Sequence, residues 1–169
     1  MFNFVEVMRY IFLLIFSFSF AQQTSNVDFK TLHATLEPNP IDKSISGEVI
    51  YQFEVLKAVD TIAIDAIKMD FTSVKINGRN INFKNSGKAL KLFQGFKIGK
   101  NTLTFYYEAF PKQTMYFVDK RQVWTQGQGK YTSHWFPSFD DVNEKVIFNM
   151  NVTFDEKYNV IANGFLKNS

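Results

Sequence analysis

The residues best suited to chemistry in this chain are two glutamines in a glycine-rich stretch, Gln126 and Gln128 within Trp124-Thr125-Gln126-Gly127-Gln128-Gly129. A glutamine amide offers a carbonyl oxygen that can accept a hydrogen bond from an ammonium group. A carboxylate would hold that cation more strongly, because hydrogen bonds to ionised acceptors are about twice as strong. Glycines on both sides of Gln128 would let backbone and ligand approach closely. Taken alone, the pattern is more typical of a polar turn between strands.

A second motif follows at a fixed spacing, and the two together resemble a known family. The later residues are Phe136-Pro137-Ser138-Phe139-Asp140-Asp141, then Lys145, Phe148 and Asn163-Gly164. The segment is similar to the amino-terminal domain of the M1 (gluzincin) zinc aminopeptidases, whose signature is Thr-Gln-x-Glu/Gln-x-x-x-Ala-Arg-x-x-Phe-Pro-Cys-x-Asp-Glu-Pro. The match has no gap between Thr125 and Asp140. It departs from the signature at Ser138 for Cys, Asp141 for Glu, Val142 for Pro and Thr132-Ser133 for Ala-Arg, so a divergent or inactive relative stays open.

The resemblance implies a role for several residues. Gln128 matches the family position that helps to recognise the free α-amine of a peptide substrate, and Gln126 is the second candidate. The Phe-Pro-x-x-Asp segment, with Phe136, Pro137 and Asp140, is a structural corner near the domain interface in that family. The family's first domain is a saddle-shaped β-sandwich that packs on a catalytic domain.

The chain offers no catalytic or metal-binding residue that we can recognise. An M1 enzyme needs a helix with His-Glu-x-x-His, which binds zinc and carries a general base. That motif is missing, the only histidines are His33 and His134, and cysteine is absent. We therefore expect no cofactor in this chain, zinc in a catalytic domain of the intact parent, and no peptide hydrolysis by this chain alone.

The amino terminus has the features of a signal peptide at residues 1–21. Arg9 precedes an apolar run from Tyr10 to Phe20, and Ser19-Phe20-Ala21 offers small residues for cleavage after Ala21. The run is shorter than the roughly 20 residues that span a bilayer, so a permanent membrane helix is the weaker interpretation. We expect export to the periplasm, the cell surface or the medium, with no membrane span in the mature protein.

Composition places residues 22–169 in one globular domain without nucleic-acid affinity. The sequence is 46% hydrophobic and 17% aromatic, which is enough to bury one core. Its net charge is only +3, and the lysines are scattered instead of forming the basic stripe that a nucleic acid requires.

Apolar residues alternate with polar ones over most of the domain, which predicts an all-β fold. The alternation is clearest at 49–55, 103–107 and 146–154, and shorter apolar runs lie at 32–36, 62–64, 71–76 and 81–83. Asn77-Gly78 is a strong hairpin signal, because a type I′ turn needs positive φ at both central residues. About ten strands in an antiparallel β-sandwich or a strongly curved sheet are expected.

Two further groups of residues have less specific interpretations. Trp124, Tyr131, Trp135 and Phe139 are expected to pack the core or a partner domain, with a carbohydrate-stacking platform as the alternative. Asp140, Asp141 and Glu144 lack a calcium-loop spacing, so we expect a solvated loop balanced by Lys145.

The leading hypothesis is the amino-terminal domain of an exported M1-type aminopeptidase, incomplete at its carboxyl end. Its expected partners are the missing catalytic domain and a peptide substrate. The alternative is a free-standing exported β-sandwich that binds a ligand or a protein without peptidase activity. A cell-surface structural protein is the third possibility.

Overall fold

The computed structural model describes residues 23–167, which form three β-sheets and two single-turn 3₁₀ helices. The predicted signal peptide lies outside the described residues. The elements in chain order are η1 Gln23–Ser25, β1 Val27–Asn39, β2 Ser44–Val55, β3 Ile62–Asp65, β4 Met69–Ile76, β5 Arg79–Asn80, β6 Phe83–Asn85, β7 Ala89–Leu92, β8 Gly99–Ala109, β9 Met115–Val118, β10 Gln122–Thr125, η2 Thr132–His134 and β11 Ile147–Val152. The all-β prediction is confirmed. Within residues 23–167, no helix is long and apolar enough to cross a membrane.

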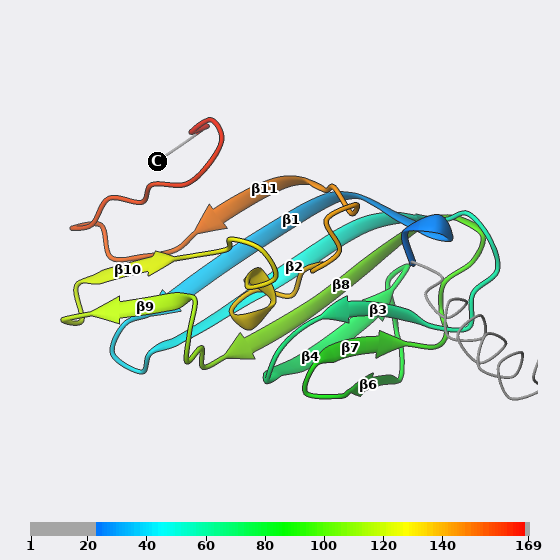
Figure 1. Ribbon diagram of the computed structural model, residues 1–169, viewed down its shortest axis with the longest axis horizontal. Helices are drawn as coiled ribbons and strands as arrows, with labels where there is room; N and C mark the ends of the chain where they lie inside the picture. Colours follow the sequence, from blue (N-terminus) through cyan, green and yellow to red (C-terminus); the bar gives the residue numbers. More distant parts are fainter. Residues whose placement is uncertain (1–22, 168–169) are drawn as a thin grey trace, which may run out of the picture.

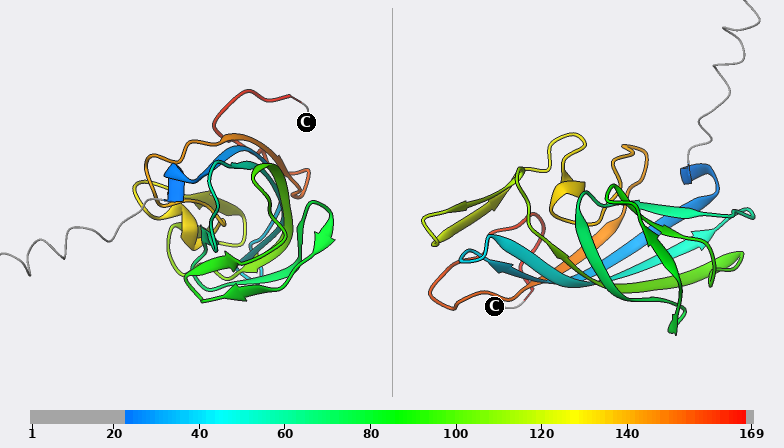
Figure 2. Two further views of the ribbon diagram at one scale, coloured as in Figure 1. Left: turned by 90° about the vertical axis from the view of Figure 1, so that its right-hand side faces the viewer. Right: turned by 90° about the horizontal axis from the view of Figure 1, so that it is seen from below.

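The main sheet has six strands in the order β11-β1-β2-β8-β4-β5 (Figure 1). Its centre is antiparallel, whereas β11 runs parallel to β1, with Leu32 opposite Phe148 and Leu36 opposite Val152. Seen end-on in Figure 2, this sheet curls strongly, and the three-stranded sheet β3-β7-β6 packs against part of its inner side. β9 and β10 form a separate hairpin.

Side-chain alternation gives the main sheet an apolar inner face and a polar outer face. One row of neighbours across the inner face contains Phe148, Leu32, Tyr51, Leu103 and Ile76. β2 shows this alternation along its length. From Gly47 to Val55, every second residue is buried, and the residues between them are half-exposed or exposed. Rings pack within this core, with the Phe29 and Phe53 centroids 5.0 Å apart.

The predicted turn at Asn77-Gly78 is confirmed by its backbone. Asn77 has φ 52° and Gly78 has φ 78°, and the turn joins β4 to β5. The strand expected at 81–83 is wrong for its first two residues, because β5 ends at Asn80 and β6 begins at Phe83. Ile81 donates its N–H to the carbonyl of Val74 at 3.1 Å, so it continues the pairing of β5 with β4 and does not begin a new strand.

Candidate functional site

The loop that carries the two glutamines leaves the β9–β10 hairpin. β10 pairs with β9 as far as Thr125 opposite Met115, and the Gln126 N–H continues the ladder to the Thr114 carbonyl at 2.7 Å. This bond fixes where the loop begins, directly before Gln128.

Backbone geometry favours glycine on both sides of Gln128. A Cβ on Gly127 would lie 2.7 Å from Thr132 Oγ1, and Gly129 has φ +68°, in the left-handed region that glycine tolerates best. The tight loop therefore leads directly into η2. Gln126 and Gln128 are both exposed, and neither amide has a hydrogen-bond partner among residues 23–167.

The Phe136–Asp140 segment is held to the main sheet by two buried tyrosines. Tyr51 Oη donates to the Pro137 carbonyl at 2.7 Å, and Tyr107 Oη donates to the Trp135 carbonyl at 3.2 Å. The Phe136 side chain is 4% exposed and meets the Tyr107 ring edge-on at 6.0 Å. Burial raises the pKa of both tyrosine hydroxyls, so both stay protonated donors.

The same segment is tied to the smaller sheet through Asp65 at the end of β3. The backbone groups of Asp65 and Ser138 exchange two hydrogen bonds of 2.9 and 3.0 Å. The Asp140 N–H donates to Asp65 Oδ2 at 2.8 Å, and Ser133 Oγ donates to Asp140 Oδ2 at 2.9 Å. Burial raises the pKa of Asp140, the Ser133 hydrogen bond lowers it, and the Asp65 charge raises it again. Phe136, Pro137 and Asp140 thus lie in a corner that is hydrogen-bonded both to the main sheet and to the sheet β3-β7-β6.

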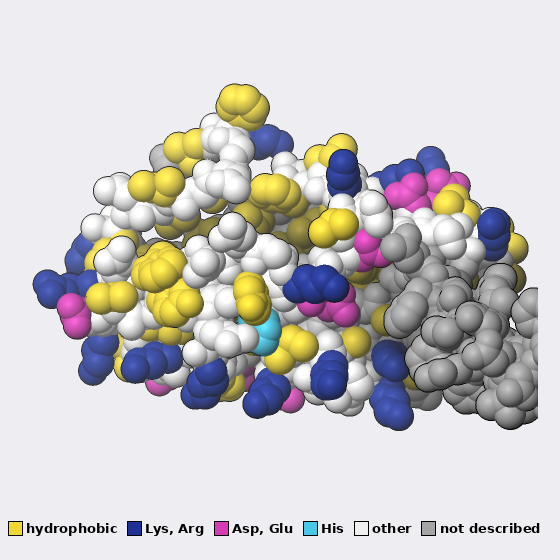
Figure 3. All heavy atoms as spheres, in the orientation of Figure 1, with side chains coloured by type: hydrophobic (Ala, Val, Ile, Leu, Met, Phe, Trp, Pro, Cys, Tyr) yellow, Lys and Arg dark blue, Asp and Glu magenta, His cyan; other side chains and the backbone are white. Residues whose placement is uncertain are grey.

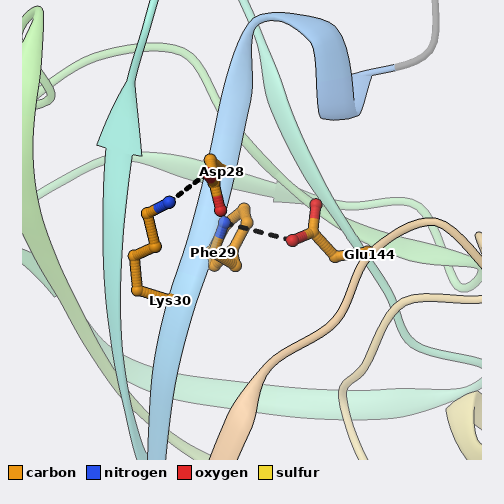
Figure 4. A network of polar contacts seen from close by, with 4 residues as sticks. All are labelled: Asp28, Phe29, Lys30 and Glu144. Carbon is orange, nitrogen blue, oxygen red and sulfur yellow. Dashed lines mark hydrogen bonds and ion pairs between the residues drawn. The ribbon is translucent and has the colours of Figure 1, made fainter.

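The expectation of a solvated acidic loop at Asp140, Asp141 and Glu144 is wrong for Asp140 and Glu144. Glu144 Oε1 accepts the Phe29 N–H at 3.1 Å, at the irregularity where β1 shifts register against β2 (Figure 4). Lys30 pairs with Asp28 and not with Glu144. Burial raises the pKa of Glu144, and the Phe29 N–H opposes that shift. Sequence reasoning missed this contact because its partners are 115 positions apart.

A cleft of about 1130 Å³ lies along the inner face of β1 and β11. Its floor includes Leu32, Leu36, Phe148, Met150 and Val152, and residues 158–163 border it as well. Figure 3 shows it as a hollow with hydrophobic side chains inside. The charged residues that line it are Arg121 and Glu144.

Gln128 lines this cleft, together with Gly127 and Trp124, whereas Gln126 is not one of its lining residues. The Trp124 ring stacks on Tyr116 with centroids 4.2 Å apart and stays 44% exposed. Trp135 is half-buried, and its Nε1 has no hydrogen-bond partner among residues 23–167. The arrangement presents one amide acceptor at the rim of an apolar groove.

The described residues do not suit a zinc ion. His33 lies on β1 opposite Ile50 and Asn149, with its side chain on the outer face. His134 lies in η2, where both ring nitrogens are within 3.2 Å of Gln113 Nε2. Within residues 23–167, no group of three or more His, Cys, Asp or Glu side chains could hold a metal ion.

Comparison with known proteins gives a family-level match. Residues 30–169 match the model of the peptidase M1 N-terminal domain. No curated protein sequence matches the chain.

Solved structures with the same fold are M1 zinc metallopeptidases and a related hydrolase. A Deinococcus radiodurans M1 zinc metallopeptidase mutant bound to a Tyr-Ser-Ala substrate superposes with a TM-score of 0.67 at 14% identity, over 75% of this chain and 32% of that one. Native leukotriene A4 hydrolase from Saccharomyces cerevisiae gives 0.69 at 19% identity, over 78% of this chain and 24% of that one. The chain thus spans about a third or a quarter of these proteins.

Proposed function

The chain belongs to the M1 peptidases as their N-terminal domain, and from this premise we propose that it forms one wall of the substrate site of an exported zinc aminopeptidase. In this proposal residues 22–169 are the domain, residues 1–21 are a cleaved signal peptide, and a catalytic domain supplies the zinc and the attacking water. The domain itself binds and orients the amino end of a peptide.

The observation that carries the proposal is the position of Gln128. Its amide is exposed, has no partner within residues 23–167, and stands at the rim of the cleft. The carbonyl oxygen can accept from a substrate ammonium, and the loop before it is fixed by the Gln126 backbone bond. A neutral amide makes a weaker anchor than a carboxylate, which suits a permissive site.

The apolar surface around the cleft favours a partner domain over a free-standing module. Trp124 and Phe148 line the groove and are each 44% exposed, and Tyr131, which precedes the lining residue Thr132, is 49% exposed. A monomeric binding module would be expected to present polar side chains there, because large exposed apolar patches mark interaction sites. A catalytic domain packed on this side would cover them.

The experiment compares Gln128→Ala with Gln126→Ala in the full-length enzyme, using peptides with free and with acetylated amino ends. Losing a hydrogen bond to a charged group costs about 1.5–3 kcal/mol, so KM for free-amine peptides should rise about 10- to 150-fold in Gln128→Ala. Gln126→Ala should change KM much less, because that side chain does not line the cleft. Gln128→Glu should tighten binding of the free amine.

Two results would reject the proposal. Equal effects of Gln128→Ala on free and acetylated peptides would remove Gln128 from amine recognition. A full-length protein that has no zinc-dependent peptidase activity would favour the free-standing exported module. The export part has its own measurement, since intact-mass analysis of the mature protein should place its first residue at Gln22.

A further inference from the structure

We propose that the free edge of β11 is the docking site for residues 159–166 of the same chain, which close onto it as an antiparallel seventh strand of the main sheet. This inference does not depend on the proposed peptidase function. It concerns another part of the lining of the cleft, because residues 158–163 and Gln128 both line that cleft.

The edge of β11 lacks the features that protect most edge strands. β11 pairs only with β1, so its other edge offers unpaired backbone N–H and C=O groups within the described chain. The strand reads Ile-Phe-Asn-Met-Asn-Val, without lysine, proline or a bulge. Such an edge readily accepts a further strand.

The segment that follows β11 is already turned back toward this edge. The Tyr158 N–H donates to the Asp155 carbonyl at 3.0 Å, and the Lys157 N–H donates to Asp155 Oδ1 at 3.1 Å. Farther along, Lys167 Nζ donates to Asn149 Oδ1 at 3.2 Å. Figure 1 shows the last residues returning past β11 after this turn. The segment therefore begins with a turn after β11 and lies near β11 at Lys167, while its middle is unpaired. Pairing of residues 159–166 with β11 would release the Lys167 contact, because Asn149 lies beside His33 on the outer face.

The turn predicts the register. Neither Glu156 nor Lys157 has a positive φ, so the turn is not of the I′ or II′ type that suits a two-residue hairpin. Hairpins with four-residue loops are built around turns of the type I kind, and a loop of residues 155–158 would place Phe154 opposite Asn159. Ile161 then lies opposite Val152, and Phe165 lies opposite Phe148.

This register places the exposed apolar side chains on the correct face. Val152 and Phe148 point to the inner face with Leu36 and Leu32. Ile161 and Phe165 are 94% and 99% exposed before docking, and pairing would turn both toward the apolar floor. Gly164, at φ +109°, bends the segment in its present conformation. Glycine can leave that conformation for an extended one without steric cost.

Cysteine cross-linking tests the register directly, because the chain contains no native cysteine. In the full chain, Val152→Cys with Ile161→Cys should form an intramolecular disulfide on mild oxidation. The matched control is Val152→Cys with Ala162→Cys, whose Cβ atoms would point to opposite faces and cannot be bridged without backbone movement. We expect the first pair to cross-link at least about tenfold faster.

Hydrogen exchange on the unmodified chain gives a second measurement that needs no substitution. The amides of residues 147–152, and every second amide of residues 159–165, the ones that face β11, should exchange at least about tenfold more slowly than those of residues 154–158, because an edge strand pairs through alternate residues. Equal cross-linking of both cysteine pairs, or no alternate protection of the amides in 159–165, would overturn the proposal. A disulfide that forms between two molecules instead would show that β11 pairs with a second copy, which also overturns it.

Discussion

Removing one buried hydroxyl should show whether the Phe136–Asp140 corner is held by the main sheet. Tyr51→Phe deletes the 2.7 Å hydrogen bond to the Pro137 carbonyl and leaves the ring in place, so no cavity of note is created. The carbonyl of buried Pro137 would then lack its partner. An unsatisfied buried acceptor costs about 1–3 kcal/mol, and we expect that loss in the free energy of unfolding.

The assay is urea unfolding followed by tryptophan fluorescence, with Tyr106→Phe as the control. Tyr106 directly precedes Tyr107 on β8 and is 41% exposed. Its hydroxyl has no hydrogen bond within residues 23–167. Tyr106→Phe should change stability by less than about 0.5 kcal/mol. The slope of the unfolding free energy against urea should stay the same in both variants, since neither changes the surface exposed on unfolding.

The second tyrosine extends the measurement. Tyr107→Phe removes a longer bond of 3.2 Å to the carbonyl of half-buried Trp135, so its cost should be lower than that of Tyr51→Phe. Because both hydroxyls hold the same corner, the double variant should deviate from additivity by about 0.5 kcal/mol or more. If Tyr51→Phe behaves like Tyr106→Phe, the corner is not fixed by these bonds and the reasoning fails.

The stabilising contribution of the Tyr51 hydroxyl should depend on pH, because only the protonated hydroxyl can donate the hydrogen bond. Burial raises its pKa above the ordinary value of 10.0, so the folded state keeps this proton longer than the unfolded chain does. Its stabilising contribution is complete below pH about 10 and declines as the pH rises further. Tyr51→Phe should remove that part of the alkaline loss of stability.

Two other predictions concern Glu144 and the glycines. Burial raises the pKa of Glu144 above 4.5, so its contribution is present at pH below about 4.5 and is lost as the pH rises through the folded-state pKa. Glu144→Gln should flatten the stability profile above about pH 4.5 in chemical unfolding, and an unchanged profile would contradict the assignment. Gly47→Ala should destabilise by about 1–3 kcal/mol, because its Cβ would lie 2.6 Å from the Thr35 carbonyl oxygen. Gly129→Ala should cost only about 1 kcal/mol, since it meets positive φ but no neighbouring atom, and thermal unfolding would distinguish the two.

Local sequence patterns predicted those parts of the fold that depend on local physics. The alternation at 49–55 lies within β2, and the Asn77-Gly78 turn has the expected positive φ values. β7, β9 and β10 were missed because none of them alternates: β7 is buried at three of four residues, β9 is buried only at its first residue, and β10 is largely exposed. The parallel direction of β11 beside β1 depends on a pairing between opposite ends of the domain, which alternation cannot indicate.

The candidate site was predictable only where a motif marked it. Gln128 was identified by its spacing from Phe136-Pro137, and the structure places it at the cleft. The contacts that position the surrounding chain had no local signal. Asp65 reaches Asp140 across 75 positions, and Gln126 is held by a backbone carbonyl that any residue would supply. Long-range polar contacts of this kind depend on the assembled sheets and not on the residues next to them in sequence.

The departures from the family signature occur at positions where the corner does not need the usual side chain. Ser138 is bonded to Asp65 through its backbone alone, and its Oγ has no partner among residues 23–167. Ser133 contributes its own hydrogen bond to Asp140, and Asp141 accepts the Asn143 N–H at 3.0 Å within its own turn. The residues that this chain has in place of the family signature therefore leave the tyrosine and aspartate contacts of the corner intact. Since the corner holds the segment that follows Gln128, the divergent signature gives no structural reason for the loop of residues 126–129 to change its position.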